Sequence, residues 1–134
     1  MRRGDLLKSW GQIKFYRYKP IGPFRAFDNR FQGEAEWNYN RLLLNHSYSV
    51  SNWADLHNYW RIHLHFGREL AVMDDNDVRR GGPIFKRLAE SWIHGRVETD
   101  ERKTLSFYLH PDWRRNDGGR SYVRGLRSGV VWKP

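Results

Sequence analysis

The chain has 134 residues and no cysteine, a formal net charge of +9 and a sequence pI of about 10.2. This length suits a single domain, residues 1–134, with one core. The absence of cysteine excludes disulfides and thiolate metal sites, and no apolar run reaches the ~20 residues that a membrane-spanning helix needs. The N-terminus lacks the apolar stretch of a secretory signal, so we expect a soluble intracellular protein without a membrane span.

The positive charge lies at the two ends of the chain. Residues 1–30 and residues 102–134 each have a net charge of +6, whereas residues 31–101 have a net charge of −3. Arginine supplies most of this charge, and its planar guanidinium binds phosphate through two parallel hydrogen bonds. We therefore expect nucleic acid, either DNA or RNA, as a partner. The alternative is a basic surface that faces an acidic protein.

The first half of the chain predicts one strand and one short helix. Ile13, Phe15 and Arg17 alternate with Lys14, Tyr16 and Tyr18, which predicts a strand with two distinct faces. Residues 34–44 place Trp37, Leu43 and Leu44 near one side of a helix, so we expect a short helix there.

The second half predicts two strands around a helix. Residues 59–66 alternate with the period of two that a half-buried strand requires. Pro83 suits the first position of a helix over residues 84–94, and Gly95 suits its end. Another alternating run, residues 104–110, predicts a second strand, and a turn-rich basic loop over residues 111–120 leads to a short final strand near Val130 and Val131. These elements predict an α+β fold: a small mixed or antiparallel sheet with one or two packed helices and basic extended termini.

Two short acidic clusters stand out in this basic protein: Asp74, Asp75 and Asp77, and then Glu98, Asp100 and Glu101. Like charges held together raise one another's pKa, so a fold that gathers them usually adds a cation, a metal ion or full solvation. If the strands on either side of the predicted helix pair, both clusters meet at one end of the sheet. Asp75, Asp77 and Asp100 would then bind Mg²⁺ and activate water for phosphodiester hydrolysis. The alternative is two unrelated solvated turns.

The order of these elements resembles the RusA-type Holliday-junction resolvases over residues 59–110. The resemblance implies a small α/β dimer that binds Mg²⁺ and cuts branched DNA. It would match Asp75 and Asp77 to the acids of the family's loop, Asp100 to its later acid, and Lys86 to its helix lysine. The chain departs from the family's pattern in its Asp-Asp-Asn-Asp order, in the RRGGP segment before the predicted helix, and in an Asp-Glu pair where the family has two Asp.

His63 and His65 lie two residues apart on the predicted strand, so both imidazoles would project from one face. This tripeptide resembles the metal-binding His-x-His of the rolling-circle HUH nucleases, which would make Tyr108 or Tyr122 the nucleophile. The alternative is a solvated or base-contacting pair of histidines.

Aromatic and cationic residues interleave near both ends of the chain, a composition that suits stacking on unpaired bases and contacts to phosphates. The charge and these residues predict a basic nucleic-acid-binding protein. The acidic clusters and the resemblance to RusA-type resolvases further predict that it is a Mg²⁺-dependent, structure-selective endonuclease. The alternative is a non-catalytic nucleic-acid-binding or accessory protein embedded in a larger ribonucleoprotein, phage or viral complex. A homodimer or a larger assembly would suit either function. The candidate nucleic-acid-binding residues are Arg79, Arg80, Lys86, Arg114, Arg115, Arg120, Arg124 and Arg127.

Overall fold

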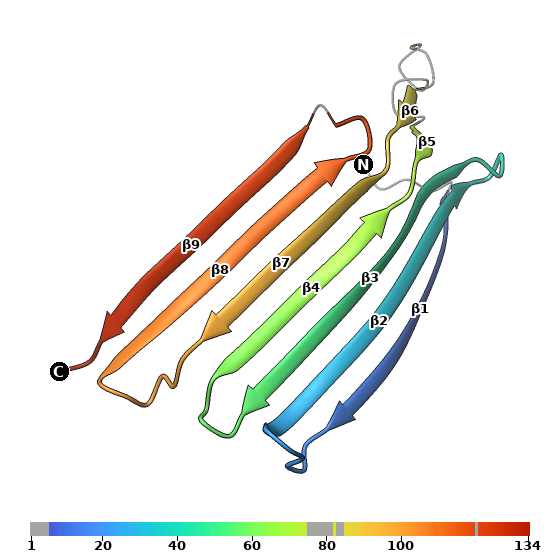
Figure 1. Cartoon of the computed structure of the whole chain (residues 1–134). Coiled ribbons are helices and arrows are strands. Elements are labelled where there is room, and N and C mark those ends of the chain that lie inside the picture. The colour runs from blue at the N-terminus through green and yellow to red at the C-terminus, as the bar shows by residue number, and fades with distance from the viewer. Residues whose placement is uncertain (1–5, 75–81, 83–84, 120) are drawn as a thin grey trace.

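The computed structural model describes residues 6–74, 82, 85–119 and 121–134, and every regular element in that part of the chain is a β-strand. Seven strands form one antiparallel sheet in the order β1-β2-β3-β4-β7-β8-β9 (Figure 1). A separate two-stranded hairpin, β5–β6, projects at one end of this sheet, between β4 and β7. The strands are β1 (Leu6–Arg17), β2 (Phe24–Asn38), β3 (Leu43–Leu56), β4 (Arg61–Glu69), β5 (Val72–Asp74), β6 (Phe85–Arg87), β7 (Glu90–Glu98), β8 (Leu105–Asn116) and β9 (Tyr122–Trp132).

The α+β fold expected from the sequence is therefore wrong, because the described residues contain no helix. The segment 34–44 ends β2, turns and begins β3, and the segment 84–94 contributes to β6 and β7. Most of the described residues near the two basic termini lie in β1 and β9, which are the edge strands of the sheet. None of the described residues forms a helix long and apolar enough to span a bilayer.

The predicted helix over residues 84–94 fails because its apolar positions also fit a strand. In β7, Trp92 and His94 pair across the sheet with Gly67 and His65 of β4, whereas the intervening Ile93 pairs with Phe66. Alternation with a period of two and helical spacing of three to four residues overlap over such a short segment. Helix propensity is a weak preference, and hydrogen bonding to β4 on one side and β8 on the other overrides it.

Several strand predictions are confirmed. Nearly all of residues 13–18 lie in β1, most of residues 59–66 lie in β4, and residues 104–110 fall almost wholly in β8. The final strand near Val130 is also present but much longer than expected, as β9. The predicted loop over residues 111–120 is wrong in its first half, because β8 continues to Asn116.

The register of the sheet separates two faces of different chemistry, because directly paired residues of neighbouring strands project to the same side. One side, which we call the apolar face, carries Ile13, Phe15, Phe31, Val50, Ile62, Leu64, Phe66, Ile93, Val97, Phe107, Leu109, Leu126 and Val130. The other, which we call the polar face, carries Lys14, Asp28, Arg30, Ser51, His63, His65, His94, Arg96, Glu98, His110, Asp112 and Arg127.

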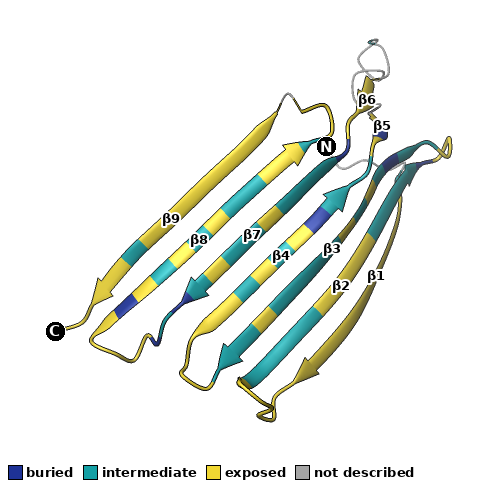
Figure 2. Ribbon diagram, in the orientation of Figure 1, coloured by how far each residue is buried: buried dark blue, intermediate teal, exposed yellow. Residues whose placement is uncertain are grey.

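Both faces of this single-layered sheet are largely open to solvent (Figure 2). On the apolar face, Ile13 is 61% exposed and Leu126 is 70% exposed. Among the described residues, the buried apolar side chains are Leu44, Val72 and Ala89, which lie in or beside the elements where the β5–β6 hairpin meets the main sheet. The described chain thus has a small core at one end and an extended apolar surface without cover.

Two glycines allow aromatic rings to lie flat on the polar face. A Cβ atom at Gly67 of β4 would overlap the ring of Trp92 on β7, and one at Gly129 of β9 would overlap the ring of Tyr108 on β8. Each ring therefore covers the backbone of the neighbouring strand. These cross-strand contacts fix the positions of two large side chains beside the histidines of the polar face.

Candidate functional site

Four side chains of the polar face form a row across four neighbouring strands. His63 of β4 pairs with Arg96 of β7, and His110 of β8 pairs with Arg127 of β9. The β7–β8 ladder has His94 opposite Asp112 and Val97 opposite Leu109, so Arg96 and His110 occupy the same level between these pairs. We call His63, Arg96, His110 and Arg127 the cationic row. With strands about 4.8 Å apart, the row extends over roughly 14 Å.

An open groove of about 560 Å³ runs along this row. Besides the four residues of the cationic row, its walls include His94 and Asp112, which contact each other through Nδ1 and Oδ1. Asp112 is the one carboxylate among the lining residues. The groove therefore presents two guanidinium groups and three imidazoles against a single negative charge.

The two arginines of the cationic row differ in their partners. The Nε of Arg96 donates a hydrogen bond of 2.7 Å to Oε1 of Glu98, and the same oxygen lies 3.8 Å from Nε2 of His110. Arg127, in contrast, has no hydrogen bond or ion pair with any described residue. Arg127 is therefore the cation of this groove whose charge is still available to a ligand.

The histidine rings pack in an ordered series beside the groove. The His63 ring stacks on Trp53 with 4.0 Å between centroids and 16° between planes, and the His65 ring lies 6.4 Å from His63 and 5.9 Å from His94. Burial lowers the pKa of His63, and the nearby His65, Arg96 and His94 lower it further. Burial and His94 lower the pKa of His65 in the same way. Both imidazoles are therefore held in the neutral form at neutral pH.

The prediction that His63 and His65 share one strand face is confirmed by the register and by their ring contact. A metal site there needs a third ligand, and within the ranges that the structure describes no group of three or more His, Asp or Glu side chains is arranged to hold a metal ion. Tyr108 lies against His110, with 5.2 Å between ring centroids, whereas Tyr122 pairs with Arg115 on the apolar face.

The predicted magnesium site falls largely outside the described residues, because Asp75 and Asp77 belong to the segment 75–81. The positions of two other residues of the acidic clusters, Asp74 and Asp100, can be compared. Asp74 ends β5, at the hairpin end of the sheet, whereas Asp100 follows β7 at the opposite end (Figure 1). The nine residues of β7 span about 25 Å between these ends.

Asp100 is also already occupied as a hydrogen-bond acceptor. Its Oδ1 accepts from the backbone N–H of Arg102 at 3.0 Å and from Nε of Arg102 at 2.8 Å, while Oδ2 accepts from Nη2 at 2.8 Å. These contacts hold the pKa of Asp100 well below its usual range. The Arg102 guanidinium in turn lies 3.1 Å from the ring centroid of Tyr59.

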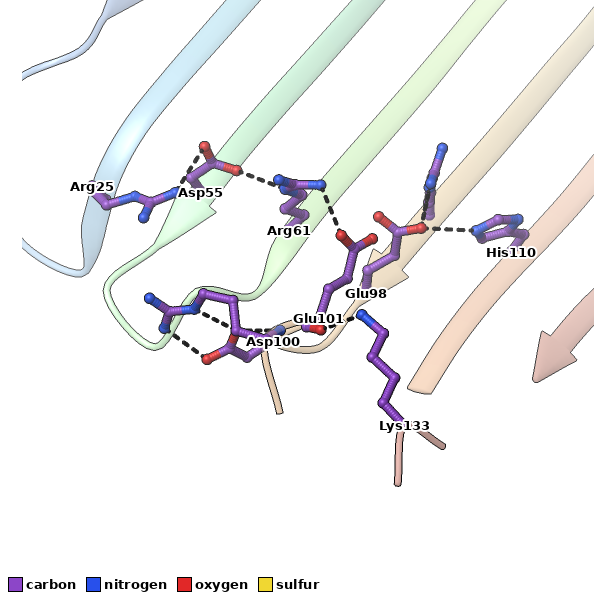
Figure 3. A network of polar contacts seen from close by, with 10 residues as sticks. Arg25, Asp55, Arg61, Glu98, Asp100, Glu101, His110 and Lys133 are labelled. Atoms are coloured by element: carbon purple, nitrogen blue, oxygen red, sulfur yellow. Dashed lines mark hydrogen bonds and ion pairs between the residues drawn. The ribbon is translucent and has the colours of Figure 1, made fainter. Parts of the chain in front are cut away.

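Around this turn, further ion pairs join neighbouring strands (Figure 3). Asp55 lies within reach of Arg25 and Arg61, and Arg61 also reaches Glu101 at 3.6 Å. The second acidic cluster is therefore part of an ion-pair network that ties the turn after β7 to β3 and β4, and its carboxylates have cationic partners from the chain itself.

The basic residues predicted to bind nucleic acid do not gather in one patch. Arg79, Arg80 and Arg120 lie outside the described residues, and Lys86 lies on the β5–β6 hairpin. The other four divide between the two faces, because neighbouring residues of a strand alternate: Arg114 and Arg127 belong to the polar face, and Arg115 and Arg124 belong to the apolar face.

Sequence reasoning singled out His63 and Arg127 but missed Arg96 and His110, and with them the cationic row. The sequence does contain a pattern that indicates the row. In three tripeptides, a histidine and a second polar residue stand on either side of one intervening residue: His63-Leu64-His65, His94-Gly95-Arg96 and His110-Pro111-Asp112. Once each tripeptide is placed on a strand, its two polar side chains fall on the same face. The helix predicted over residues 84–94 concealed the middle tripeptide and with it the row.

Searches of family models, curated proteins and solved structures found no significant match to this chain, so the resemblance to RusA-type resolvases stays a prediction.

Proposed function

We propose that this chain is a non-catalytic nucleic-acid-binding component of a larger assembly, and that nucleic acid binds along the polar face. The observation that carries the proposal is the cationic row, in which Arg127 lacks an ionic partner among the described residues and Arg96 adds a second guanidinium two strands away. Guanidinium groups bind phosphate oxygens, and a row that crosses the strands would follow the backbone of a single strand of nucleic acid.

Ring surfaces beside the row add to this support. The Trp53 indole, 43% exposed, stacks on His63 at the β3 end of the groove. Single-stranded nucleic acid commonly binds where cations line a groove and aromatic rings offer stacking surfaces, and each stacked base contributes roughly 1 to 3 kcal/mol. The polar face combines both features in one groove, where Arg96 and Arg127 line the walls and Trp53 stacks on the lining residue His63.

The same geometry favours binding over catalysis. Asp74 and Asp100 lie at opposite ends of the sheet, and Arg102 already satisfies the Asp100 carboxylate. The uncovered apolar face favours a place in a larger assembly, because contiguous apolar patches of this kind are rare on isolated soluble monomers.

The proposal predicts that Arg127→Ala weakens binding to single-stranded DNA or RNA. Loss of one phosphate contact weakens binding about uniformly across sequences and lowers the slope of log K against log salt by about 1. Fluorescence anisotropy of labelled oligonucleotides at several salt concentrations measures both quantities, with the full chain held in a non-ionic detergent that covers its apolar face.

Arg17→Ala is the matched control, because Arg17 lies on the apolar face of β1 and has no ionic partner among the described residues. This variant removes the same charge and is expected to retain full binding. Equal loss in both variants, or loss in Arg124→Ala with none in Arg127→Ala, would contradict binding on the polar face. Parallel incubation of single-stranded, duplex and junction substrates with Mg²⁺ or EDTA tests catalysis, and metal-dependent cleavage would contradict the non-catalytic proposal.

A further inference from the structure

The cationic row brings groups together that repel one another when all are charged. Arg96 lies at the same level as His63 on one side and His110 on the other, and His110 faces Arg127. Like charges placed directly opposite each other across a sheet are destabilising. Elsewhere on the polar face, cations pair with carboxylates, as Lys14 does with Asp28 at 2.7 Å and Lys8 with Glu34 at 2.8 Å. Within the row, Arg96 binds Glu98, whereas Arg127 has no ionic partner among the described residues. The row therefore keeps one cation, Arg127, for an anion from outside the chain.

Unpaired polar atoms mark the same groove. The Nε2 atoms of His63 and His110 are shielded from solvent and have no hydrogen-bond partner among the described residues. An unpaired buried polar atom costs free energy, and the nearby guanidinium of Arg96 further disfavours protonation of His63.

We infer that this groove is a phosphate-group site whose occupation is coupled to uptake of a proton by His63. A tetrahedral dianion between Arg96 and Arg127 would offset the guanidinium charge of Arg96, which disfavours protonation of His63. His110 lies beside the same position, and its Nε2 is 3.8 Å from Oε1 of Glu98. The inference rests on the proposed function only in its choice of phosphate as the anion.

The charges around both histidines come from all the strands packed against them. Around His63, β3 contributes Asp55, β4 contributes Arg61 and His65, and β7 contributes His94, Arg96 and Glu98. Around His110, β7 contributes Arg96 and Glu98, β8 contributes Tyr108 and Asp112, and β9 contributes Arg127. Several of these charges already neutralise one another, since Asp55 contacts Arg61 at 3.8 Å and Glu98 binds Arg96. Arg127 remains as the uncompensated charge among these described groups, so filling the site at Arg127 changes the field at His110 most directly.

The direction of the pH dependence follows from His63. Its pKa is lowered in the empty groove, so it is neutral at pH 7. An anion in the groove raises this pKa, and the filled site therefore binds more protons than the empty site near and below pH 6.5. Affinity for the anion increases as pH falls through this range, by up to about ten-fold per pH unit for one coupled proton.

Two inorganic anions provide the test, inorganic phosphate and sulfate. Sulfate stays a dianion between pH 5.5 and 8, so any pH dependence of its binding comes from the protein, whereas phosphate itself titrates. Each anion is added to the full chain in non-ionic detergent, and histidine ring NMR signals report binding. We expect sulfate to shift the signals of His63 and His110, and its affinity to rise as pH falls from 7.5 to 5.5.

Variants distinguish binding of the anion from the dependence of that binding on pH. Arg127→Ala is expected to weaken sulfate and phosphate binding at least ten-fold, while Arg17→Ala leaves it unchanged. His63→Gln keeps a polar side chain and is expected to retain binding with a smaller dependence on pH. Binding that is independent of pH in the unaltered chain, or that survives Arg127→Ala, overturns the inference.

The outcomes also distinguish this inference from the proposed function. If sulfate binds with proton uptake but oligonucleotides do not bind, the phosphate-group site stands and nucleic acid is the wrong source of the phosphate. If oligonucleotides bind on the polar face but neither anion perturbs the row histidines, the site inference fails while the proposed function stands.

Discussion

At the residue scale, Asp100 shows how a single neighbouring residue can supply hydrogen bonds to both oxygens of a carboxylate. Arg102, two positions later, supplies its backbone N–H and two guanidinium N–H groups, and Asp100 is only 6% exposed. The guanidinium also covers the ring of Tyr59, whose backbone has a φ of 62° in the turn between β3 and β4. A residue whose sequence context suggests a metal ligand therefore holds two turns of the chain together.

We predict that Asp100→Asn lowers thermal stability at neutral pH. The pKa of Asp100 is lowered in the folded chain, so its contribution is fully present above the ordinary carboxyl pKa of about 3.9 and is lost as pH falls through the lower folded pKa. The difference in Tm between Asp100→Asn and the unaltered chain should be largest near pH 7 and should shrink in strong acid. Thermal scans by circular dichroism at several pH values measure it.

Glu101→Gln is the control for this prediction, because the Glu101 side chain is 54% exposed and reaches Arg61 only at 3.6 Å. Exposed ion pairs of this kind contribute little, so we expect a small and nearly pH-independent change in Tm. An Asp100→Asn variant as stable as Glu101→Gln across the pH range would refute the role assigned to Asp100.

At the element scale, the sequence predicts strands where alternation is uninterrupted and fails where small or apolar residues blur it. Residues 59–66 alternate cleanly and fall largely in β4, whereas the Ile-Phe and Trp-Ile pairs at 84–85 and 92–93 also fit one face of a helix. The strand at 90–98 depends on hydrogen bonding to β4 and β8, whose partner residues lie well outside the segment itself, so local patterns could not decide between strand and helix.

We predict that Gly67→Ala destabilises the sheet, because a Cβ atom at Gly67 would overlap both the Trp92 ring and the backbone oxygen of Tyr48. Overpacking of this kind typically costs about 1 to 3 kcal/mol. Gly11→Ala is the control: a Cβ atom at Gly11 in β1 would have nothing within 4 Å, so alanine there should be neutral or stabilising by about 0.5 to 1 kcal/mol. Denaturant unfolding measures the free energy of unfolding of both variants. Equal values for the two variants would contradict the contact between Gly67 and Trp92.

At the scale of the whole molecule, net charge is less informative than the side of the sheet on which each charge lies. Consecutive residues such as Arg114 and Arg115 form one patch in the sequence, yet they belong to opposite faces. Arg114 is also paired with Glu90 at 3.3 Å, so it adds little to the available positive charge. Which arginines share a surface could be predicted only with the strand register, and the register depends on the whole sheet.

We predict that the uncovered apolar face makes the chain associate or bind detergent, and that Leu126→Lys reduces this behaviour. Leu126 is 70% exposed on the apolar face of β9, and burying one such side chain contributes about 1.5 to 3 kcal/mol. Val123→Lys is the matched control, since Val123 is 51% exposed on the polar face of the same strand. Sedimentation and binding of a hydrophobic dye compare the two variants, and equal effects would argue against the difference between the faces.

The β5–β6 hairpin has a consequence for how this chain tolerates change. Glu69 and Glu90, on either side of the segment 70–89, are paired across β4 and β7, so the ladder closes without any contribution from that segment. Entropy of loop closure grows slowly, by only about 0.6 kcal/mol for each doubling of loop length. The junction between β4 and β7 is therefore a point at which sequence can be gained or exchanged while the seven-stranded register is kept. Exchange would remove buried Val72 and Ala89 and the contacts of Arg87 with Leu44 and Glu69. New binding segments can be added there without redesigning the sheet.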